Sequence, residues 1–598
     1  MQAYEREENR MSYPCEQYYR QTPVRTFDLN KTLYQTVFEQ NANNMNSEAI
    51  GFLGYRMTFA ELKRKVDRLA DAYRKAGVKE GDTVAICTIS MPIVQENLLA
   101  LSKLGATSKW IDLRIKGKDL VKNLKESHCR ILVVFEGVVD AIVEIMDETE
   151  LQHILVASPK TYLNPVIRLL ANLKDKKEGK YVCMPKDVRF ERYSDFVASG
   201  SKNSSWAPVE FNKDRPSIIV QSSGSTGRAK SIIHTEYNFN SCMQKEAYTD
   251  LQFAVGRTMY VAIPPFIIYG LNNSVYAALA FGMKAEMSPF VSETTVFDGL
   301  GKYDFACAAP LHYRYLYKQI MECQEKEASV TGKERKNYKT KLAKIRKKLA
   351  RVKCFVSGGD RISVQELVSM EQLFETPIIN GYGNNELTGA AIISPVYANR
   401  PEAVGIPMKG IRVAAFEVDT EEMLEQGTEG EICIQSDCVF EGYLNNEEET
   451  KRVKRVHEDG LFWIHSGDLG YVDSDGYVYI TGRAKRLIKR EAFKIAPESI
   501  ESVILELDEV KDCVVVGVSE IEREGSSVPM AYVELMDPSM NRVDEIKRRI
   551  EEKCRAELPE YECPEYIEMI DKIPYKNTKH DFKTLEAMGE EYIRIKKS

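Results

Sequence analysis

A short loop rich in serine, threonine and glycine constrains the fold of this chain more than any other stretch. It follows the apolar run Ile218–Val220, which is typical of a buried strand. In the loop, Ser222–Lys230, two glycines let the backbone approach an anion, four hydroxyls and the peptide N–H groups can donate hydrogen bonds, and Lys230 adds a cation. The pattern predicts a strand that feeds a polyphosphate-binding loop.

Two other interpretations of this loop compete with that prediction. A surface turn rich in serine and glycine has the same composition, so composition alone does not separate the two. The phosphate loop of nucleoside triphosphatases is disfavoured, because it needs glycine directly before the lysine and a helix after it. Here Ala229 precedes Lys230, and Ser231–His234 has an extended pattern.

Composition and charge narrow the class of protein. The 598 residues are enough for several domains, and 82 basic against 89 acidic residues do not favour a nucleic-acid binder. Thirteen cysteines occur without a CxxC pair, which predicts reduced thiols and no zinc. The N-terminus is charged, and no apolar run is long enough to cross a bilayer, so we expect a cytoplasmic protein.

The order of predicted elements indicates a mostly parallel sheet. Thr58 and Glu61 form a capping box at the start of a helix that runs to about Ala76. A strand at 84–87, a helix at 93–104 and a continuous apolar strand at 131–135 follow. The stretch 173–208 is polar and is expected on the surface. The basic stretch 324–353 fits a solvated helix better than a site for an acidic ligand such as the phosphates of CoA.

Two further glycine-containing turns follow strand-like runs. Ser357–Asp360 comes after Cys354–Val356, and Asn380–Glu386 comes after Pro377–Ile379. In open α/β sheets, ligands bind where strands end, so both turns are candidate binding elements. His465–Leu469 and Gly482–Arg483 add a later carboxylate and guanidinium.

Taken in order, these elements resemble the adenylate-forming superfamily of acyl-CoA synthetases, luciferases and adenylation domains of peptide synthetases. The resemblance implies that Tyr382 stacks on adenine, Asn385 stands where a threonine binds the α-phosphate, Glu386 holds Mg²⁺ and Asp468 accepts both ribose hydroxyls. The residues that it assigns to ATP or AMP are Ser222, Ser223, Gly224, Ser225, Thr226, Gly227, Lys230, Gly358, Gly359, Asp360, Asn380, Gly381, Tyr382, Gly383, Asn385, Asp468 and Arg483.

The resemblance also implies the domain organisation. We expect an N-terminal arm at 1–28, an α/β domain of layered, mostly parallel sheets with flanking helices at 29–484, and a small mobile α+β domain at 485–598. Lys485 stands at the expected hinge. In the smaller domain, Pro497 opens a helix, 513–518 and 530–535 are strands, and 543–558 is an amphipathic helix.

The implied reaction joins a carboxylic acid to AMP with release of pyrophosphate and then passes the acyl group to a thiol, most often CoA. Amino-acid-activating relatives pair the substrate ammonium with a buried aspartate, but Ile267 and Ile268 stand there, so an acid without an α-amine is favoured. The candidate acyl pocket, in which any aromatic could equally be core, is Tyr237, Phe239, Phe266, Ile267, Tyr269 and His312. The loop implied to line a CoA tunnel contains Arg490, Ala492 and Phe493.

The C-terminal lysine of the family has an ambiguous register here. Counting forward from Ile573 selects His580, whereas counting back from Asp581–Lys583 selects Lys579. We favour Lys579 as the catalytic residue, because a permanent cation suits two converging anions better than an imidazole that is mostly neutral near pH 7. A solvated tail charge is the other interpretation.

Several departures from the family pattern keep alternatives open. These are Ala229, Ile267 where acyl-CoA synthetases usually have histidine, Asn385, and Ala492 where they have glycine. The alternatives to an acyl-CoA synthetase are an enzyme that loads a separate carrier protein and an inactive nucleotide-binding relative. The identity of the acid and the oligomeric state are not predicted.

Overall fold

The computed structural model describes residues 17–597 apart from 179–181, 203–205, 222–229, 290–291, 293–294, 297–299, 459, 491–492, 520–526, 538–541 and 577–578. The chain forms two compact units. The first contains Met1–Arg412, Gln435–Ile464 and Asp475–Tyr477. The second contains Val413–Ile434, His465–Ser474 and Val478–Ser598.

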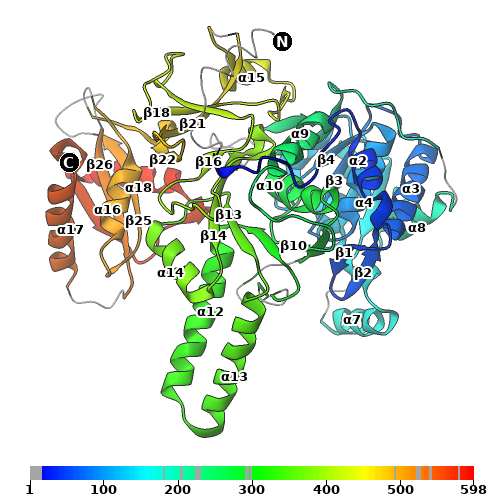
Figure 1. Ribbon diagram of the computed structural model, residues 1–598, viewed down its shortest axis with the longest axis horizontal. Coiled ribbons are helices and arrows are strands. Elements are labelled where there is room, and N and C mark those ends of the chain that lie inside the picture. The colour runs from blue at the N-terminus through cyan, green and yellow to red at the C-terminus, as the bar shows by residue number, and fades with distance from the viewer. Residues whose placement is uncertain are drawn as a thin grey trace. The chain divides into compact units, whose positions relative to one another are not determined.

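The first unit contains a nine-stranded sheet with the order β16-β15-β14-β13-β12-β10-β11-β1-β2 (Figure 1). Its six inner strands, from β14 to β1 in that order, are parallel, and β2, β15 and β16 pair antiparallel. The carboxyl ends of the six strands therefore share one edge. The strands are β1 Glu48–Phe52, β2 Tyr55–Thr58, β10 Thr258–Val261, β11 Lys284–Met287, β12 Phe305–Ala308, β13 Cys354–Gly358, β14 Ile378–Asn384, β15 Gly389–Ile393 and β16 Ile406–Pro407.

A second sheet of the first unit has eight strands in the order β19-β9-β8-β4-β3-β5-β6-β7. The strands from β8 to β7 in that order are parallel, whereas β9 pairs antiparallel with β8 and β19 with β9. The predicted strands at 84–87 and 131–135 are confirmed. The strands are β3 Thr83–Cys87, β4 Thr107–Trp110, β5 Ile131–Phe135, β6 His153–Ala157, β7 Phe190–Arg192, β8 Pro216–Gln221, β9 Ser231–Thr235 and β19 Gly442–Tyr443.

Helices flank these two sheets. The predicted capping box of α3 is present, since Thr58 and Glu61 each bond the other's backbone N–H, and α4 ends at Gly105 with φ 67°. The longer helices are α2 Leu33–Gln40, α3 Phe59–Lys75, α4 Ile93–Leu104, α5 Gly117–Lys125, α7 Pro165–Lys177, α9 Glu236–Glu246, α12 Pro310–Ser329, α13 Gly332–Leu349 and α14 Val364–Phe374. The shorter ones are α6 Val139–Val143, α8 Tyr193–Ser199, α10 Ile268–Gly270, α11 Ala277–Ala280 and α15 Glu447–Val453.

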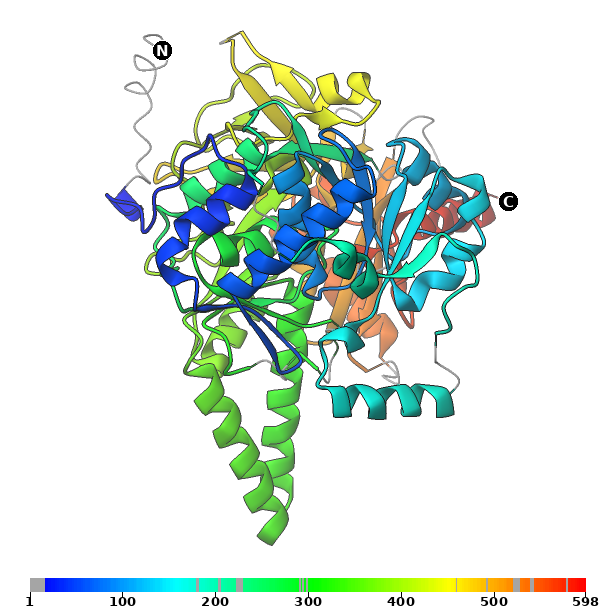
Figure 2. The ribbon, with the colours of Figure 1, turned by 90° about the vertical axis from the view of Figure 1, so that its right-hand side faces the viewer.

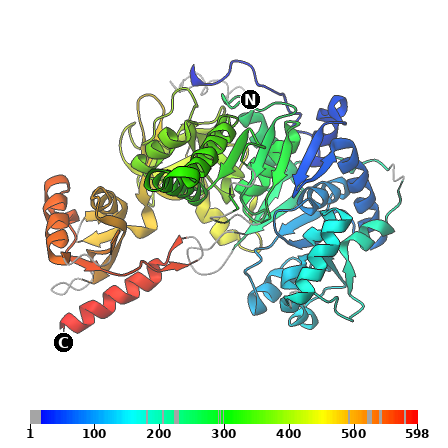
Figure 3. The same ribbon diagram turned by 90° about the horizontal axis from the view of Figure 1, so that it is seen from below.

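Helices α12 and α13 form an antiparallel hairpin that extends away from the nine-stranded sheet, as Figures 1 and 2 show and as Figure 3 shows end-on. The base of α12 joins the core through Tyr313, Leu316 and Ile320. In α13 only Leu349 is buried. The basic stretch is therefore a solvated helix, as the sequence predicts.

The second unit contains two groups of strands. Strands β17 Arg412–Phe416, β18 Gly430–Gln435 and β21 Phe462–Val472 are neighbours in one sheet, and β22 Val478–Arg483 pairs with β21. Residues 462–464 of β21, which belong to the first unit, pair with β20 Lys454–Val456. Toward the C-terminus, β25 Val510–Ser519 and β26 Ser527–Leu535 are antiparallel, and β27 Tyr566–Met569 is parallel to β26.

Helices cover both faces of this C-terminal sheet. Ile500 of α16 and Ile546 of α17 share a core with Val515, whereas Leu585 of α18 packs with Val514 on the other face. The bounds are α16 Pro497–Leu505, α17 Val543–Glu557 and α18 Phe582–Lys597, with hairpins β23 Ile488–Arg490/β24 Phe493–Ile495 and β28 Tyr575–Lys576/β29 Lys579–His580.

The predicted fold class is confirmed: large α/β layers in one unit and a smaller α+β unit. Proline opens α16 at its first position, as expected. Among the residues that the structure describes, no helix combines the length and the apolar character needed to span a bilayer.

Candidate active site

Four candidate motifs lie at the same edge of the nine-stranded sheet because each follows a parallel strand. Phe266–Tyr269 comes after β10, His312 after β12, Gly359–Asp360 after β13, and Asn385–Glu386 after β14. The sheet therefore brings motifs that are far apart in the sequence close together in space. This edge is the candidate site of the first unit.

Two glycines at this edge are required by the backbone. Gly359 has φ +82°, in the region that favours glycine. A Cβ on Gly383 would lie 1.8 Å from the carbonyl oxygen of Gly389, so β14 and β15 approach each other too closely for any side chain there. Asn380, by contrast, uses its amide structurally, since Nδ2 donates to the carbonyl of Ala403 at 2.9 Å.

Asn385 connects three of the predicted motifs. Its Nδ2 donates to the carbonyl of Gln221 at 3.2 Å, the last residue of β8 before the serine-rich loop. Its Oδ1 accepts from the backbone N–H of Ile268 at 3.3 Å, in the candidate acyl motif. An amide can donate and accept at once on separate atoms, so the departure from threonine creates a bridge between the loop, the acyl motif and β14.

A chain of polar contacts joins Lys230 to Glu386. Lys230 forms an ion pair with Glu449, and its Nζ lies 4.8 Å from the ring centroid of Tyr443. The hydroxyl of Tyr443 donates to Oε1 of Glu386 at 2.7 Å. Hydrogen bonds from Arg452, and then from Lys230, lower the pKa of Glu449 to about 2, so this carboxylate is anionic at neutral pH. Sequence reasoning did not identify Tyr443 or Glu449 as site residues.

The carboxylate of Glu386 fits the proposed magnesium ligand by its chemistry. It lies in a short 3₁₀ turn at Asn385–Leu387 and is half-buried. One of its oxygens is oriented by Tyr443, and Mg²⁺ prefers carboxylate oxygen of this kind, usually with one or two carboxylates and the substrate phosphates. The residues present therefore fit a site in which the nucleotide supplies the remaining ligands.

Two of the candidate acyl residues have well-defined packing partners. Phe239 is fully buried and packs against His234 and Tyr276, which fits the interpretation as core. The ring of Tyr269 lies against Gly358 and its hydroxyl donates to the carbonyl of Val356 at 3.0 Å.

The other candidate acyl residues show different degrees of burial. Phe266 is nearly buried and Ile267 is 36% exposed. Burial lowers the pKa of His312, so its imidazole is neutral. Tyr237 lies close to Asp437, at 3.4 Å between the phenol oxygen and Oδ2.

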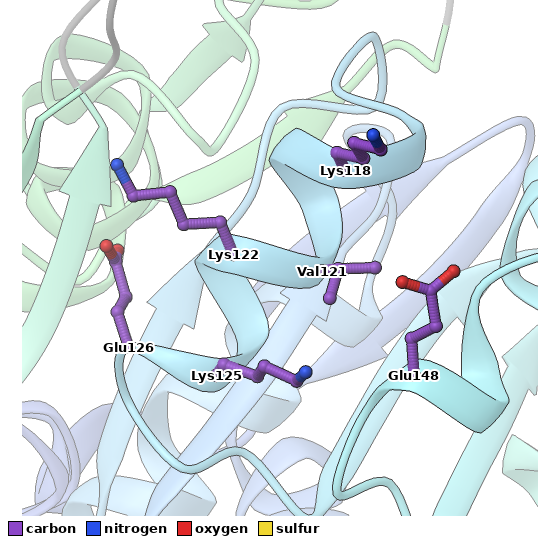
Figure 4. A pocket seen from close by; sticks show the side chains of 6 residues that line it. All are labelled: Lys118, Val121, Lys122, Lys125, Glu126 and Glu148. Carbon is purple, nitrogen blue, oxygen red and sulfur yellow. The ribbon is translucent and has the colours of Figure 1, made fainter.

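A shallow depression lies beside the first residues of β9 (Figure 4). It is lined by Lys118, Val121, Lys122, Lys125, Glu126 and Glu148. Glu126 connects it to the loop region, because its Oε1 accepts from Ser231 at 2.5 Å and from the buried Lys109 at 2.8 Å. These contacts hold the start of β9 in place. We assign no binding role to the depression itself.

In the second unit, Asp468 and Arg483 are opposite each other on β21 and β22. Nε of Arg483 is 2.8 Å from Oδ1 of Asp468. Asp468 is buried, and its backbone N–H is held by Ser466 Oγ at 3.0 Å. The carboxylate of Asp468 offers oxygen acceptors of the kind that hydroxyl donors need.

A buried cluster near Asp468 is the one group of potential metal ligands among the described residues. Nδ1 of His465 is 2.8 Å from Oε2 of Glu431 and 3.4 Å from Sγ of Cys433. Because Glu431 also accepts from the N–H of Gly467 at 3.0 Å, the cluster fixes the turn that carries Asp468.

The predicted hinge residue Lys485 is exposed and lies in the 3₁₀ turn Ala484–Arg486. The next residue, Arg486, is held by Glu498 at 2.6 Å and by Glu501 at 2.7 Å. Arg490 pairs with Glu565 at 2.9 Å. The chain is thus anchored within the second unit immediately after Lys485.

The two candidates for the C-terminal catalytic residue lie on β29. Nε2 of His580 is 2.9 Å from Oδ2 of Asp512, which also accepts from the hydroxyl of Tyr575 at 2.6 Å. Burial opposes ionisation of Asp512, but the bonds from His580 and Tyr575 outweigh it and lower its pKa. The imidazole of His580 is therefore engaged in a structural contact, and Lys579 stays the predicted catalytic residue.

Some predicted site residues lie outside the described residues. They are Ser222, Ser223, Gly224, Ser225, Thr226, Gly227 and Ala492. The side chains of Phe493 and Lys579 also lie outside the description, although β24 and β29 contain their backbones.

Comparison with known families gives two matches. Residues 37–444 match the model of AMP-binding enzymes, and residues 499–579 match the model of the C-terminal domain of AMP-binding enzymes. The first match alone covers more than half of the chain.

Individual relatives are distant but extend over most of the chain. A 4-coumarate–CoA ligase-like protein of Oryza sativa is 23% identical over 87% of this chain and 85% of its own length. A long-chain-fatty-acid–CoA ligase of Bacillus subtilis is 22% identical over 91% and 92%, respectively.

Solved structures share the fold. The structure of ATP-bound MatB from Rhodopseudomonas palustris aligns with a TM-score of 0.76 at 21% identity, covering 95% of this chain and 99% of that one. The anthranilate CoA ligase AuaEII in complex with anthranoyl-AMP aligns with a TM-score of 0.75 at 18% identity, with the same coverage.

Proposed function

Because this chain belongs to the AMP-binding enzymes, within the adenylate-forming superfamily, we propose that it activates a carboxylic acid with ATP and transfers the acyl group to CoA. In the first step a carboxylate oxygen attacks the α-phosphorus, the bond to the bridging oxygen of the β-phosphate breaks, and pyrophosphate leaves. In the second step the thiol sulfur attacks the acyl carbon, AMP leaves, and the thiol proton is lost to solvent.

The bridge made by Asn385 carries this proposal. It holds the end of β8, where the serine-rich loop begins, next to the acyl motif at Ile268. The first step needs an acid carboxylate and an α-phosphate within bonding distance, and positioning of this kind is a major source of rate. A side chain that ties both motifs to β14 supplies that positioning.

Charge supports the same reaction. Two anions must approach each other, so cations that face the phosphates lower the barrier. Lys230 supplies one cation, and Glu386 would hold Mg²⁺, which supplies a Lewis acid for the phosphate oxygens. Lys579 would add a second permanent cation from the small unit. Asp468 and Arg483 would bind the ribose.

The acid that we propose lacks an α-amine and is largely apolar. Ile267 and Ile268 offer no partner for an ammonium group, and an unpaired buried ammonium is costly. Phe266 and Tyr269 add aromatic surface at the same edge. Among the relatives named above, one is named for long-chain fatty acids and one for anthranilate, an acid whose amine is on the ring and not on an α-carbon.

The experiment that tests the function measures pyrophosphate release and acyl-CoA formation across matched acids: fatty, aromatic and polycyclic acids, each with an α-amino counterpart. We expect acid-dependent pyrophosphate release and an acyl-CoA product, with the α-amino counterparts inactive. AMP formation that is indifferent to CoA would indicate a carrier protein as acceptor. Absence of acid-dependent exchange of pyrophosphate into ATP would refute catalysis.

A further inference from the structure

Helix α7, Pro165–Lys177, presents its polar side to the protein. Asp175 pairs with Lys160 at 2.6 Å, and Lys160 in turn reaches Glu136 at 3.3 Å. Arg168 donates to the carbonyls of Thr161 and Leu163 at 2.8 and 3.2 Å. Amphipathic helices of globular proteins normally have the opposite orientation, with the apolar side inward.

The apolar side of α7 faces solvent. Five large aliphatic side chains are more than half exposed: Val166 66%, Ile167 54%, Leu169 61%, Leu170 60% and Leu173 55%. At about 100° per residue they fall within an arc of about 160°, opposite Arg168 and Asp175. No residue of α7 is buried. Figures 1 and 2 both show the helix apart from the two sheets.

A further exposed apolar residue lies on the hairpin that packs against the turn preceding α7. Tyr162, three residues before the start of α7, packs against Phe52 and Tyr55 of the β1–β2 hairpin, with ring centroids 5.9 and 5.3 Å apart. Leu53, in the turn of that hairpin, is 54% exposed. An exposed patch of this kind marks a surface that contacts another body.

The charges on α7 indicate what kind of surface this apolar patch contacts. Lys174, Lys176 and Lys177 occupy the last turn. The side chain of Lys174 is 73% exposed and lies 3.8 Å from the carboxylate of Glu178, the C-cap residue. The single acidic residue of the helix, Asp175, faces Lys160. With the C-cap Glu178 counted, three lysines stand against one carboxylate at this end of the helix, so a second copy of the same face would bring more positive than negative charge to these lysines. An apolar stripe that ends in lysines complements an anionic, flat, apolar surface.

We propose that α7 docks this protein onto an anionic lipid bilayer, with its five aliphatic side chains in the acyl-chain boundary and its lysines among the headgroups. Helices that lie in the membrane interface combine such an apolar face with lysines. The helix lies on the bilayer and does not cross it. This inference does not depend on the proposed reaction.

The test is flotation of the full-length protein with vesicles of phosphatidylcholine containing phosphatidylglycerol. We expect binding that the double substitution Leu169→Gln/Leu173→Gln weakens at least ~10-fold, because the apolar contribution is lost. Lys174→Glu/Lys177→Glu should weaken binding to the anionic vesicles by a similar factor. The matched control is Met588→Gln/Ile595→Gln, which replaces exposed apolar residues of α18 (42% and 66%) and should leave binding unchanged.

A positional readout accompanies the binding measurement. Tryptophan at position 169 (L169W) should be quenched by brominated phosphatidylcholine in the vesicles. Equal vesicle binding of the parent protein and Leu169→Gln/Leu173→Gln would overturn the proposal, as would absence of quenching. A parent protein that ignores vesicles but dimerises, with the dimer lost in that variant, would assign the face to a second copy and also overturn it.

Discussion

Replacing the buried Glu246 by glutamine should change how the stability of the first unit depends on pH. Glu246 is the last residue of α9 and is 5% exposed. Its Oε1 accepts from Asn273, while Oε2 has no hydrogen-bond partner among the described residues. Burial raises the pKa of this carboxyl to about 8, and the bond from Asn273 offsets only part of that rise.

The sign of the effect follows from the two protonation states. Between the unfolded pKa near 4.5 and the folded pKa of about 8, the unfolded chain has lost the proton and the folded protein keeps it. Stability is therefore lost as pH rises through this window, by a factor of ten in the folding equilibrium per pH unit. From pH 5.5 to 7.5 the loss is about hundredfold, or about 3 kcal/mol.

Glutamine has a similar size and keeps the acceptor for Asn273 but does not titrate. We therefore expect the free energy of unfolding of Glu246→Gln to rise by about 3 kcal/mol relative to that of the parent protein as the pH goes from 5.5 to 7.5. The chain has three tryptophans, Trp110, Trp206 and Trp463, and all belong to the first unit. Their fluorescence in urea titrations thus reports on unfolding of that unit.

The control substitution is Glu325→Gln, at an exposed position of α12. The free energy of unfolding of this variant should change with pH in the same way as that of the parent protein. The difference in free energy of unfolding between Glu246→Gln and the parent protein could instead stay constant from pH 5.5 to 7.5. In that case Glu246 is ionised in the folded protein, and the reasoning from burial is wrong.

Three further predictions concern the proposed reaction. Asp468→Ala should raise the Kd for ATP roughly 10- to 100-fold, because two ribose hydroxyls lose a charged acceptor, and leave acid binding nearly unchanged; calorimetry with ATP measures this, and an unaltered Kd removes Asp468 from the site. Glu386→Gln should lower turnover and shift the Mg²⁺ titration to higher concentration, since one carboxylate oxygen is lost; coincident titration curves would contradict the metal role. Lys579→Ala should slow adenylation severely yet spare CoA attack on supplied acyl-adenylate, whereas His580→Ala should keep adenylation. The reverse result would assign the catalytic role to His580.

Local signals in the sequence predicted much of the fold. The capping box at Thr58, the buried strand at Ile131–Phe135 and the proline at the start of α16 all depend on neighbours within a few residues, and all three are present. The turn at Gly358–Asp360 also falls at a strand end, as expected.

Contacts between distant residues could not be predicted. Lys230 directly precedes β9 and Glu449 follows β19, and the two form an ion pair because these strands are neighbours. Nothing in the sequence around either residue indicates the other as its partner. The bridge from Asn385 to Gln221 depends on how two sheets approach each other. The apolar face of α7 is exposed, the reverse of the usual orientation of an amphipathic helix, and local periodicity alone gives no sign of that.

The order of strands in the nine-stranded sheet has a consequence for the synthesis of the chain. The apolar strand β1 ends at Phe52, and its parallel neighbour β11 begins at Lys284, about 230 residues later. At a translation rate of about 5–20 residues per second, β1 waits on the order of 10 to 50 seconds for that neighbour. During this interval its edge lacks β11, so slower synthesis lengthens the time for which that edge can pair with another chain.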